Sequence, residues 1–394
     1  MINAARLKDE FLELVSISSP SKREGTIARR LETILKTMGA SVEVDGAGEK
    51  IGGDTGNLLA RFPGNTPGAP PFLLSGHMDT VGPAEAIHPV VEGDVIRTDG
   101  TSVLGGDDKA GVVAILEAVR ILRERRIPHG DLEVVLTISE EYGLLGAKNF
   151  DTGRLRAKRG LVLDVDGVFE LITRAPAANR MTFTVHGLAA HAGICPEQGM
   201  SAIRIAAEAI AVMKLGRLDA ETTANLGIIQ GGLAGNIVPA SVTVRGETRS
   251  LSLEKLAAQT EHMRRCFDEA AARHRVQVGD RQYQARVEAQ VERQYGRLDV
   301  RDEAAIVRLV QAAAGAMGRA CATRGTGGGS DANVFVERGL EVANLACGMR
   351  EIHTVNEWVD VRDLVLTAGL VVETVRLNAR GLSAPPVHPA AGVR

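Results

Sequence analysis

PFLLSGHMDTV, residues 71–81, is a run of apolar residues that ends in polar ones, and it decides the fold. A short apolar run of this kind predicts a buried strand. DLEVVLTISEE (131–141) and GLVLDVDG (160–167) have the same form, whereas KAGVVAILEAVRILRERR (109–126) has the periodicity of an amphipathic helix. Because strands alternate with helices, we expect an α/β domain whose sheet is flanked by helices.

The three predicted strands all end in acidic or imidazole side chains. Open α/β sheets commonly form their sites at the carboxyl ends of their strands. We therefore expect these strand ends to converge on one functional site.

The chain is long enough for two domains, since its 394 residues exceed what one hydrophobic core usually serves. From about Arg180 the pattern changes to alternating strands and longer helices, and after about residue 290 the α/β pattern returns. The sequence thus predicts a compact α+β insertion that divides the first domain.

The composition argues against several classes of protein. A net charge of -3, a pI near 6.3 and an aromatic content of 3% disfavour nucleic-acid binding. The four cysteines form no CxxC pair, and the first residues predict an amphipathic helix rather than an export signal. Apolar runs are too short to span a bilayer. We expect a soluble, cytoplasmic protein without a membrane partner.

Two motifs supply potential metal ligands. In SGHMDT, His77 and Asp79 share one face of a strand, so Asp79 can accept the second ring N–H of His77 and fix its tautomer. In LGGDDKAG, Asp107 and Asp108 are adjacent acids before a helix, and they are costly to bury without a cation. Taken singly, the first motif is more typical of a surface polar pair and the second of a helix N-cap.

Three further motifs extend the set. Glu140 and Glu141 end a strand in SEEYG, so one can bind metal while the other transfers a proton, although such pairs are often only solvated charge. Asp164 and Asp166 lie on one strand face, and either can be a ligand. His353 in MREIHTVNEW is a lone histidine, which is more often a structural residue.

Oxygen and imidazole ligands without cysteine favour zinc, cobalt or manganese over a structural zinc site. Two ions about 3.5–4 Å apart, bridged by one carboxylate and a hydroxide, would create a nucleophile and polarise a carbonyl group. The predicted reaction is therefore hydrolysis of an amide bond.

Nine motifs resemble, in order, those of the M20 family of dinuclear metallopeptidases, and most closely its peptidase T branch. They cover most of the chain: SGHMDTV, GGDDKAG, ISEEYGLLGAK, the DG of LVLDVDG, HGLAAHAG, GGLAGNIVP, GETRS, GTGGGSDAN and IHT. The resemblance implies a zinc-peptidase-like catalytic domain, with a mixed sheet flanked by helices, formed by residues 1–177 and 290–394. It also implies that residues 178–289 form an α+β lid domain through which the protein makes a homodimer.

The resemblance implies a site for two divalent ions, zinc first, with cobalt or manganese as alternatives. Carried over by motif, His77 and Asp166 would bind one ion, Glu141 and His353 the other, and Asp107 would bridge them.

The resemblance also implies roles outside the ligand shell. Glu140 would be the general base for a metal-bridging hydroxide, and Asp79 would orient His77. The Asp107–Asp108 peptide bond would be cis, which is rare outside proline.

Four residues of the later motifs would bind the substrate by resemblance to the family: His191, Asn236, Arg249 and Gly328. His191 would hold a substrate carbonyl or carboxylate, either in its own subunit's site or in that of a partner subunit. Asn236 can equally cap a turn, and Arg249 can equally form an ion pair within its own domain.

Short peptides are the expected substrates. In the family, aspartate at the position of Asp166 is typical of aminopeptidases, so the sequence favours a tripeptidase or aminopeptidase. The alternatives are a carboxypeptidase or N-acyl amino acid amidohydrolase of the same family and, from another class, a non-catalytic metal- or peptide-binding protein. Glu140 argues against the last, because a purely structural site needs no base.

Overall fold

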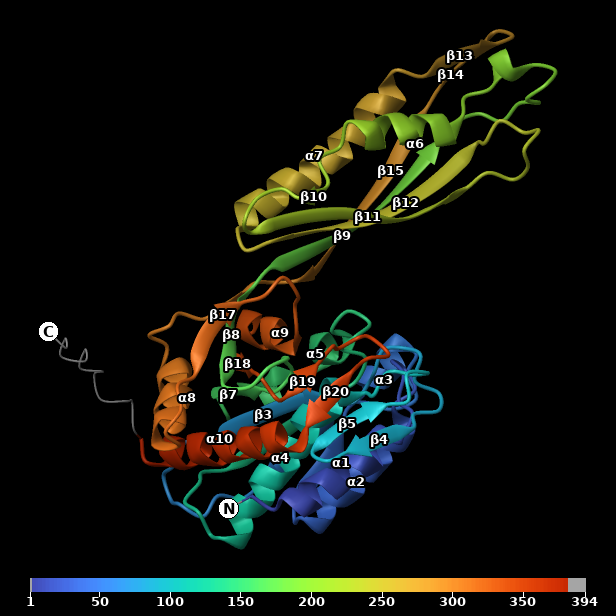
Figure 1. Cartoon of the computed structure of the whole chain (residues 1–394). Helices are drawn as coiled ribbons and strands as arrows, with labels where there is room; N and C mark the ends of the chain where they lie inside the picture. Colours follow the sequence, from blue (N-terminus) through green and yellow to red (C-terminus); the bar gives the residue numbers. More distant parts are fainter. Residues whose placement is uncertain (1, 382–394) are drawn as a thin grey trace, which may run out of the picture. The chain divides into compact units, whose positions relative to one another are not determined.

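The computed structural model describes residues 2–381, which form two compact units. Within these residues, unit 1 comprises 2–174, Leu298–Thr326 and 330–381, and unit 2 comprises Ala175–Arg297 and Gly327–Gly329. The chain thus leaves unit 1 after Arg174 and returns at Leu298 (Figure 1), and it passes briefly through unit 2 again at Gly327–Gly329. The last residues of the predicted segment 290–394, from 382 onward, lie outside the described part.

Unit 1 is built on a large mixed sheet, which has nine strands within the described part of the chain. The order is β1-β2-β6-β3-β7-β18-β8-β16, with β17 beside β8. β3 pairs in parallel with β6 and β7, and β18 pairs in parallel with β7, whereas β2 is antiparallel to β6. The strands are β1 (Ser41–Val44), β2 (Leu58–Phe62), β3 (Phe72–His77), β6 (Leu132–Thr137), β7 (Arg159–Val162), β8 (Glu170–Ala175), β16 (Leu298–Asp299), β17 (Ala322–Gly325) and β18 (Glu341–Leu345).

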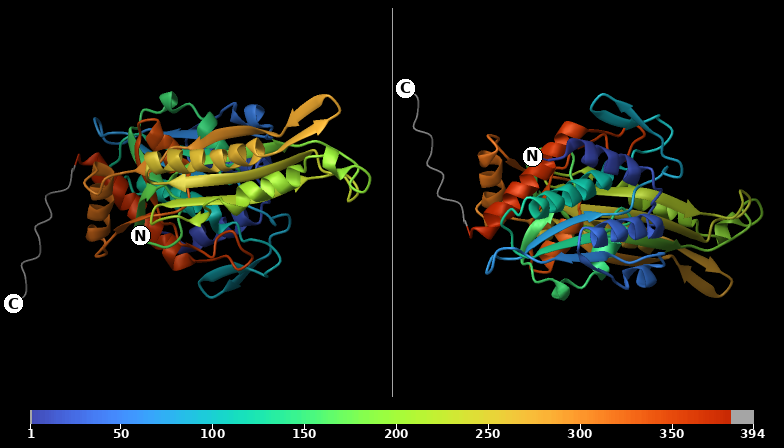
Figure 2. Two further views of the ribbon diagram at one scale, coloured as in Figure 1. Left: turned by 90° about the horizontal axis from the view of Figure 1, so that it is seen from above. Right: turned by 90° about the horizontal axis from the view of Figure 1, so that it is seen from below.

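Helices flank this sheet, as the nearly continuous apolar runs of β3 and β6 require, because every residue of both strands is buried. α4 packs on β3, and α1 and α10 pack beside α4 and each other (Figure 2, right). α9 packs on β18 and α5. The helices are α1 (Ala4–Val15), α2 (Gly25–Thr37), α3 (Ala47–Ile51), α4 (Gly106–Glu124), α5 (Leu145–Asn149), η1 (Thr152–Arg154), α8 (Ala305–Ala316), α9 (Asp331–Glu337) and α10 (Val361–Ala379). The predicted α/β class with a mixed, helix-flanked sheet is confirmed.

A small second sheet in unit 1 joins early and late parts of the chain. Its order is β19-β20-β5-β4, and β20 pairs antiparallel with β5. The strands are β4 (Pro89–Glu92), β5 (Val95–Thr98), β19 (Met349–Arg350) and β20 (Trp358–Asp360). The segment that contains His353 lies between β19 and β20, so this pairing fixes both of its ends.

Unit 2 is an antiparallel sheet covered on one face by two helices (Figure 1). The sheet order is β10-β11-β12-β9-β15, and α6 and α7 pack on each other and on β9 and β12. Phe183 of β9 and Phe267 of α7 stack in the core with ring centroids 4.4 Å apart. The elements are β9 (Ala177–His186), η2 (Pro196–Gln198), α6 (Ala202–Ala211), β10 (Gly216–Arg217), β11 (Thr222–Gly231), β12 (Ser241–Ser250), α7 (Leu253–Ala272), β13 (Arg275–Val278), β14 (Arg281–Gln284) and β15 (Arg286–Tyr295).

No helix among residues 2–381 is long and apolar enough to cross a membrane.

Candidate metal centre

Three parallel strands of unit 1 bring their carboxyl ends to one edge of the sheet. β3 ends at His77, which lies opposite Thr137 at the end of β6. β7 ends at Val162, on the other side of β3. Acidic residues follow the ends of β6 and β7, so the predicted strand ends do converge in space.

His77 is the buried centre of this group. Its Nδ1–H faces Asp79, with the main-chain oxygen of Asp79 at 3.0 Å and Oδ1 at 3.3 Å. Its Nε2 lies 3.1 Å from Asp107 Oδ1 and 3.7 Å from Asp164 Oδ1. Because Asp79 fixes the Nδ1 side of the ring, Nε2 is the atom presented to the carboxylates.

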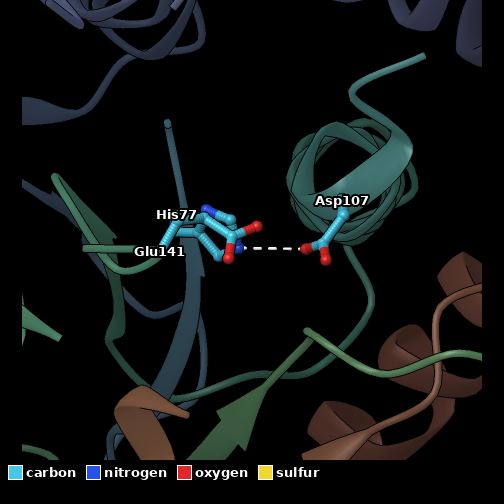
Figure 3. A group of neighbouring side chains, drawn as sticks. All are labelled: His77, Asp107 and Glu141. Carbon is cyan, nitrogen blue, oxygen red and sulfur yellow. Dashed lines mark hydrogen bonds and ion pairs between the residues drawn. The ribbon is translucent and has the colours of Figure 1, made fainter. Parts of the chain in front are cut away.

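Asp107 lies between two histidines. Its Oδ1 faces His77, and its Oδ2 lies 3.1 Å from Nε2 of His353. The same nitrogen of His353 lies 2.9 Å from Oε1 of Glu141. His77, Asp107 and Glu141 each offer a ligand atom, and these atoms lie within 4.8 Å of one another (Figure 3).

The backbone at Asp107 and Asp108, which is not helical although it lies in the first turn of α4, turns Asp107 toward this group. The Asp107–Asp108 peptide bond is cis, as the resemblance implied. Asp108 is buried behind the ligands, where its Oδ2 accepts a hydrogen bond from the backbone N–H of His77 (3.0 Å) and its Oδ1 accepts one from Gly111 (3.2 Å). The two adjacent acids therefore have different partners: Asp107 faces the histidines and Asp108 ties α4 to β3.

The structure does not bring Asp166 to the cluster, and it places Asp164 there instead. The side chain of Asp164 is 12% exposed and faces His77, whereas that of Asp166 is 56% exposed. Asp166 forms an ion pair with Arg324 of β17 at 2.6 Å. β7 ends before both acids, so the alternation that put them on one face no longer applies.

Asp79 holds the acidic loop after β6 as well as His77. Its Oδ1 accepts a hydrogen bond from the backbone N–H of Glu140 (2.9 Å), and its Oδ2 accepts one from that of Glu141 (3.2 Å). Ser21 Oγ donates a third hydrogen bond to Oδ2 at 2.6 Å. One buried carboxylate thus positions the histidine and both glutamates.

Burial dominates the electrostatics of the cluster. It raises the pKa of Asp164 to about 7 and the pKa of Glu140 well above its usual value. At Asp107, hydrogen bonds from His353 and His77 outweigh burial and hold the pKa below its usual value. Hydrogen bonds to Asp107 and Glu141 raise the pKa of His353 to about 10. The cluster therefore favours positive charge at its centre, and its imidazole and carboxylate donors fit divalent ions such as zinc, cobalt or manganese.

Lys109 is a buried cation beside the ligands that the sequence interpretation did not include. Its Nζ donates hydrogen bonds to Ser19 Oγ (2.7 Å) and to the main-chain oxygen of Met78 (2.9 Å). Burial lowers the pKa of Lys109 to about 8. Its place after the Asp-Asp pair was visible in the sequence, but its contact with the first residues of the chain was not.

The predicted substrate residues lie in unit 2. His191 and Asn236 are exposed and lie on adjacent segments, since the backbone N–H of Ala192 donates to the main-chain oxygen of Asn236 at 3.0 Å. Arg249 forms an ion pair with Glu247 at 2.9 Å, which is the alternative that the sequence left open for it. Its Nη1 also donates to the main-chain oxygen of Gly327 at 3.2 Å, next to Gly328. Their contacts with substrate stay a prediction.

Comparison with known proteins identifies relatives along almost the whole chain. A model of peptidase family M20/M25/M40 matches residues 73–377. The uncharacterized protein YqjE of Bacillus subtilis strain 168 is 41% identical over 381 residues, which are 96% of this chain and 100% of that protein. The crystal structure of aminopeptidase PepT from Bacillus cereus ATCC 10987 has 41% identity and a TM-score of 0.85, and covers 96% of this chain and 99% of its own. That of a tripeptidase from Staphylococcus aureus subsp. aureus mu50 has 36% identity and a TM-score of 0.89, and covers 96% and 100%.

Proposed function

The chain belongs to peptidase family M20/M25/M40, and from this membership we propose that it removes the amino-terminal residue from short peptides, as a tripeptidase or aminopeptidase. Peptide-bond hydrolysis itself follows from the family. The finer assignment is supported by the two relatives named aminopeptidase and tripeptidase, which share 41% and 36% identity with this chain. The acid beside His77 is Asp164 rather than Asp166, but it is also an aspartate. Because aspartate at this ligand position is typical of aminopeptidases in the family, the resemblance still favours an aminopeptidase.

The catalytic centre that we propose holds two divalent ions, zinc first, with cobalt or manganese as alternatives. His77 and Asp164 would bind one ion, Glu141 and His353 the other, and Asp107 would bind both. The observation that supports this arrangement most directly is that each oxygen of Asp107 faces a different histidine, at 3.1 Å in both cases.

Asp164 takes the place that the sequence interpretation gave to Asp166. The support is geometric, because Asp164 faces His77 while Asp166 is paired with Arg324. An exposed acid engaged by an arginine is poorly placed to serve a buried ion.

Glu140 is the general base in this proposal. When bound, the ions would lower the pKa of a coordinated water and polarise the scissile carbonyl group. Glu140 would take a proton from the attacking water and pass it to the leaving nitrogen. Its burial, which raises its pKa, supports a group that must both accept and return a proton.

Asp79 would be the orienting residue. It holds the Nδ1 side of His77 and the backbone N–H groups of Glu140 and Glu141. The carboxylate of Asp79 would therefore hold the ligand His77 and the base Glu140 at a fixed distance from each other.

Unit 2 is proposed as the lid domain and the homodimerisation surface, with His191, Asn236, Arg249 and Gly328 as substrate-binding residues. Exposure of His191 and Asn236, and the contact of Arg249 with the glycine loop, support this role. We also propose a cytoplasmic protein without nucleic-acid or membrane partners. The net charge of -3 supports the absence of a nucleic-acid partner.

Two substrates separate the aminopeptidase from its alternatives. Metal-loaded protein is incubated with a tripeptide and with the same tripeptide N-acetylated, and the products are identified by mass spectrometry. An aminopeptidase releases the first residue of the free tripeptide and leaves the acetylated one intact. Faster cleavage of the acetylated peptide, or release of its last residue, would establish the N-acyl amidohydrolase or carboxypeptidase instead.

A further inference from the structure

Glu357 is a buried carboxylate that holds the loop carrying Asp107. The residue is 1% exposed. Its Oε2 accepts hydrogen bonds from the backbone N–H groups of Leu104 (2.9 Å) and Gly105 (2.8 Å), and its Oε1 accepts one from that of Asp107 (2.8 Å). Three backbone N–H groups of one loop thus share a single side chain, which fixes the loop in place.

The loop is shaped to receive the carboxylate. Gly105 has a φ of 72°, a conformation that favours glycine, and it turns the backbone N–H groups toward one point. A Cβ on Gly106 would lie 2.9 Å from Oε1 of Glu357, so the second glycine leaves room for it. Gly105 and Gly106 thus shape the loop around Glu357, which lies 250 positions from Asp107.

Glu357 is also tied to the segment of His353. Its backbone N–H donates to the main-chain oxygen of Thr354 at 3.2 Å, which closes a tight turn after His353. Thr98 Oγ1 donates to the main-chain oxygen of Val355 at 3.1 Å, and β20 begins directly after Glu357. The side chain therefore links the turn that follows His353 to the loop that presents Asp107.

We propose that Glu357 is a positioning residue that sets the separation of Asp107 and His353, and with it the affinity for the ion that His353 and Glu141 would bind. Its three hydrogen bonds go to backbone N–H groups, so it acts through the placement of Asp107 rather than as a ligand. This inference rests on the proposed two-ion centre.

The test replaces the carboxylate by its neutral isostere, Glu357→Gln. The amide keeps one acceptor oxygen and turns an N–H₂ group toward a backbone N–H. Metal-free protein is titrated with Co²⁺ by isothermal calorimetry, and visible absorption reports the coordination of each ion. The wild type should take up two ions, and E357Q should bind the ion near His353 about 10- to 100-fold more weakly, the usual effect of losing an outer partner. The ion near His77, which shares Asp107, should lose less affinity, because His77 is held by Asp79 and Asp108 and, of the two histidine segments, only that of His353 is tied to Glu357.

Glu133 supplies a matched control in the same unit. It is also a buried carboxylate, 1% exposed, and its Oε2 accepts hydrogen bonds from the backbone N–H groups of Arg156 (2.9 Å) and Ala157 (2.8 Å). Neither residue is next to a proposed ligand. Glu133→Gln should lower the melting temperature of the metal-free protein as E357Q does, yet bind both ions like the wild type.

Gly106→Ala approaches the same contact from the loop, because the added Cβ would displace the carboxylate of Glu357. It should reproduce the selective loss, and it provides the test if E357Q does not fold. Wild-type affinity for both ions in E357Q and G106A, or an equal loss in E133Q, would overturn the positioning role alone. Uptake of a single ion by the wild type would instead overturn the two-ion centre, and this inference with it.

Discussion

Replacing Asp164 and Asp166 separately by asparagine distinguishes the two candidate ligands, which share one segment and one side-chain type. In Asp164→Asn the backbone should be retained. The side chain of Asn344 accepts from the N–H of Asp164 at 2.9 Å and donates to its main-chain oxygen at 3.0 Å, and neither bond involves the carboxylate. The change therefore removes one negative charge beside His77 and little else.

The expected magnitudes differ widely between the two variants. Loss of an outer partner of a metal ligand costs about 10- to 100-fold in affinity, so loss of a charged ligand should exceed about 100-fold, or about 2.7 kcal/mol. Asp166, by contrast, is 56% exposed, and its ion pair with Arg324 is worth about 0.2–1 kcal/mol of folding stability. Arg324 also keeps its ion pair with Glu170 at 2.6 Å.

Two quantities are measured for each variant. Inductively coupled plasma mass spectrometry gives the metal content after dialysis, and a kinetic assay gives the rate of tripeptide hydrolysis. D164N should retain one ion or fewer and lose nearly all hydrolysis, while D166N should match the wild type in both measurements. The opposite pattern, in which D166N loses an ion and D164N does not, would show that the exposed acid is the ligand and that the geometric reasoning is wrong.

Four other perturbations test separate parts of the account. Glu140→Gln should keep both ions by metal analysis and lower kcat about 10²- to 10⁴-fold, because only proton transfer is lost; unchanged kcat would remove Glu140 as the base. His353→Ala should lose one ion while the other stays bound, and loss of both would show that the two halves of the centre are not separable. Removal of metal by a chelator should lower the melting temperature of unit 1, and each ion restored at 100 times its Kd should return about 2.7 kcal/mol, whereas an unchanged melting curve would argue against a buried centre. Phe267→Ala should destabilise unit 2 by about 3–5 kcal/mol, because the ring is buried against Phe183, and circular dichroism during urea unfolding measures it; a cost below 1 kcal/mol would contradict that packing.

The fold class was predictable because its main signal is local. The apolar runs at 71–81, 131–141 and 160–167 predict strands, and the structure has β3, β6 and β7 there. Each observed strand is shorter than its apolar run, because the polar residues at its end leave the sheet to form the site.

The choice between Asp164 and Asp166 could not be made in this way. Alternation gives both acids the same face, and the decision depends on Arg324, which lies on β17 far along the chain. Glu357 and Lys109 were missed for a related reason, since their partners are backbone groups and a loop serine remote in sequence. The composition of a short segment carries no signal of such partners.

The position of β18 in the sheet constrains when the protein can first work. β18 (Glu341–Leu345) lies between β7 and β8, in the interior of the large sheet, although it is nearly the last strand to be synthesised. A nascent chain that has emerged only through unit 2 therefore has a gap in its central sheet and has not yet produced His353. Such a chain cannot complete the centre, so peptidase activity begins only after nearly all of the protein has left the ribosome. By the same reasoning, a fragment that stops before β18 should be inactive until the missing C-terminal piece is supplied to it.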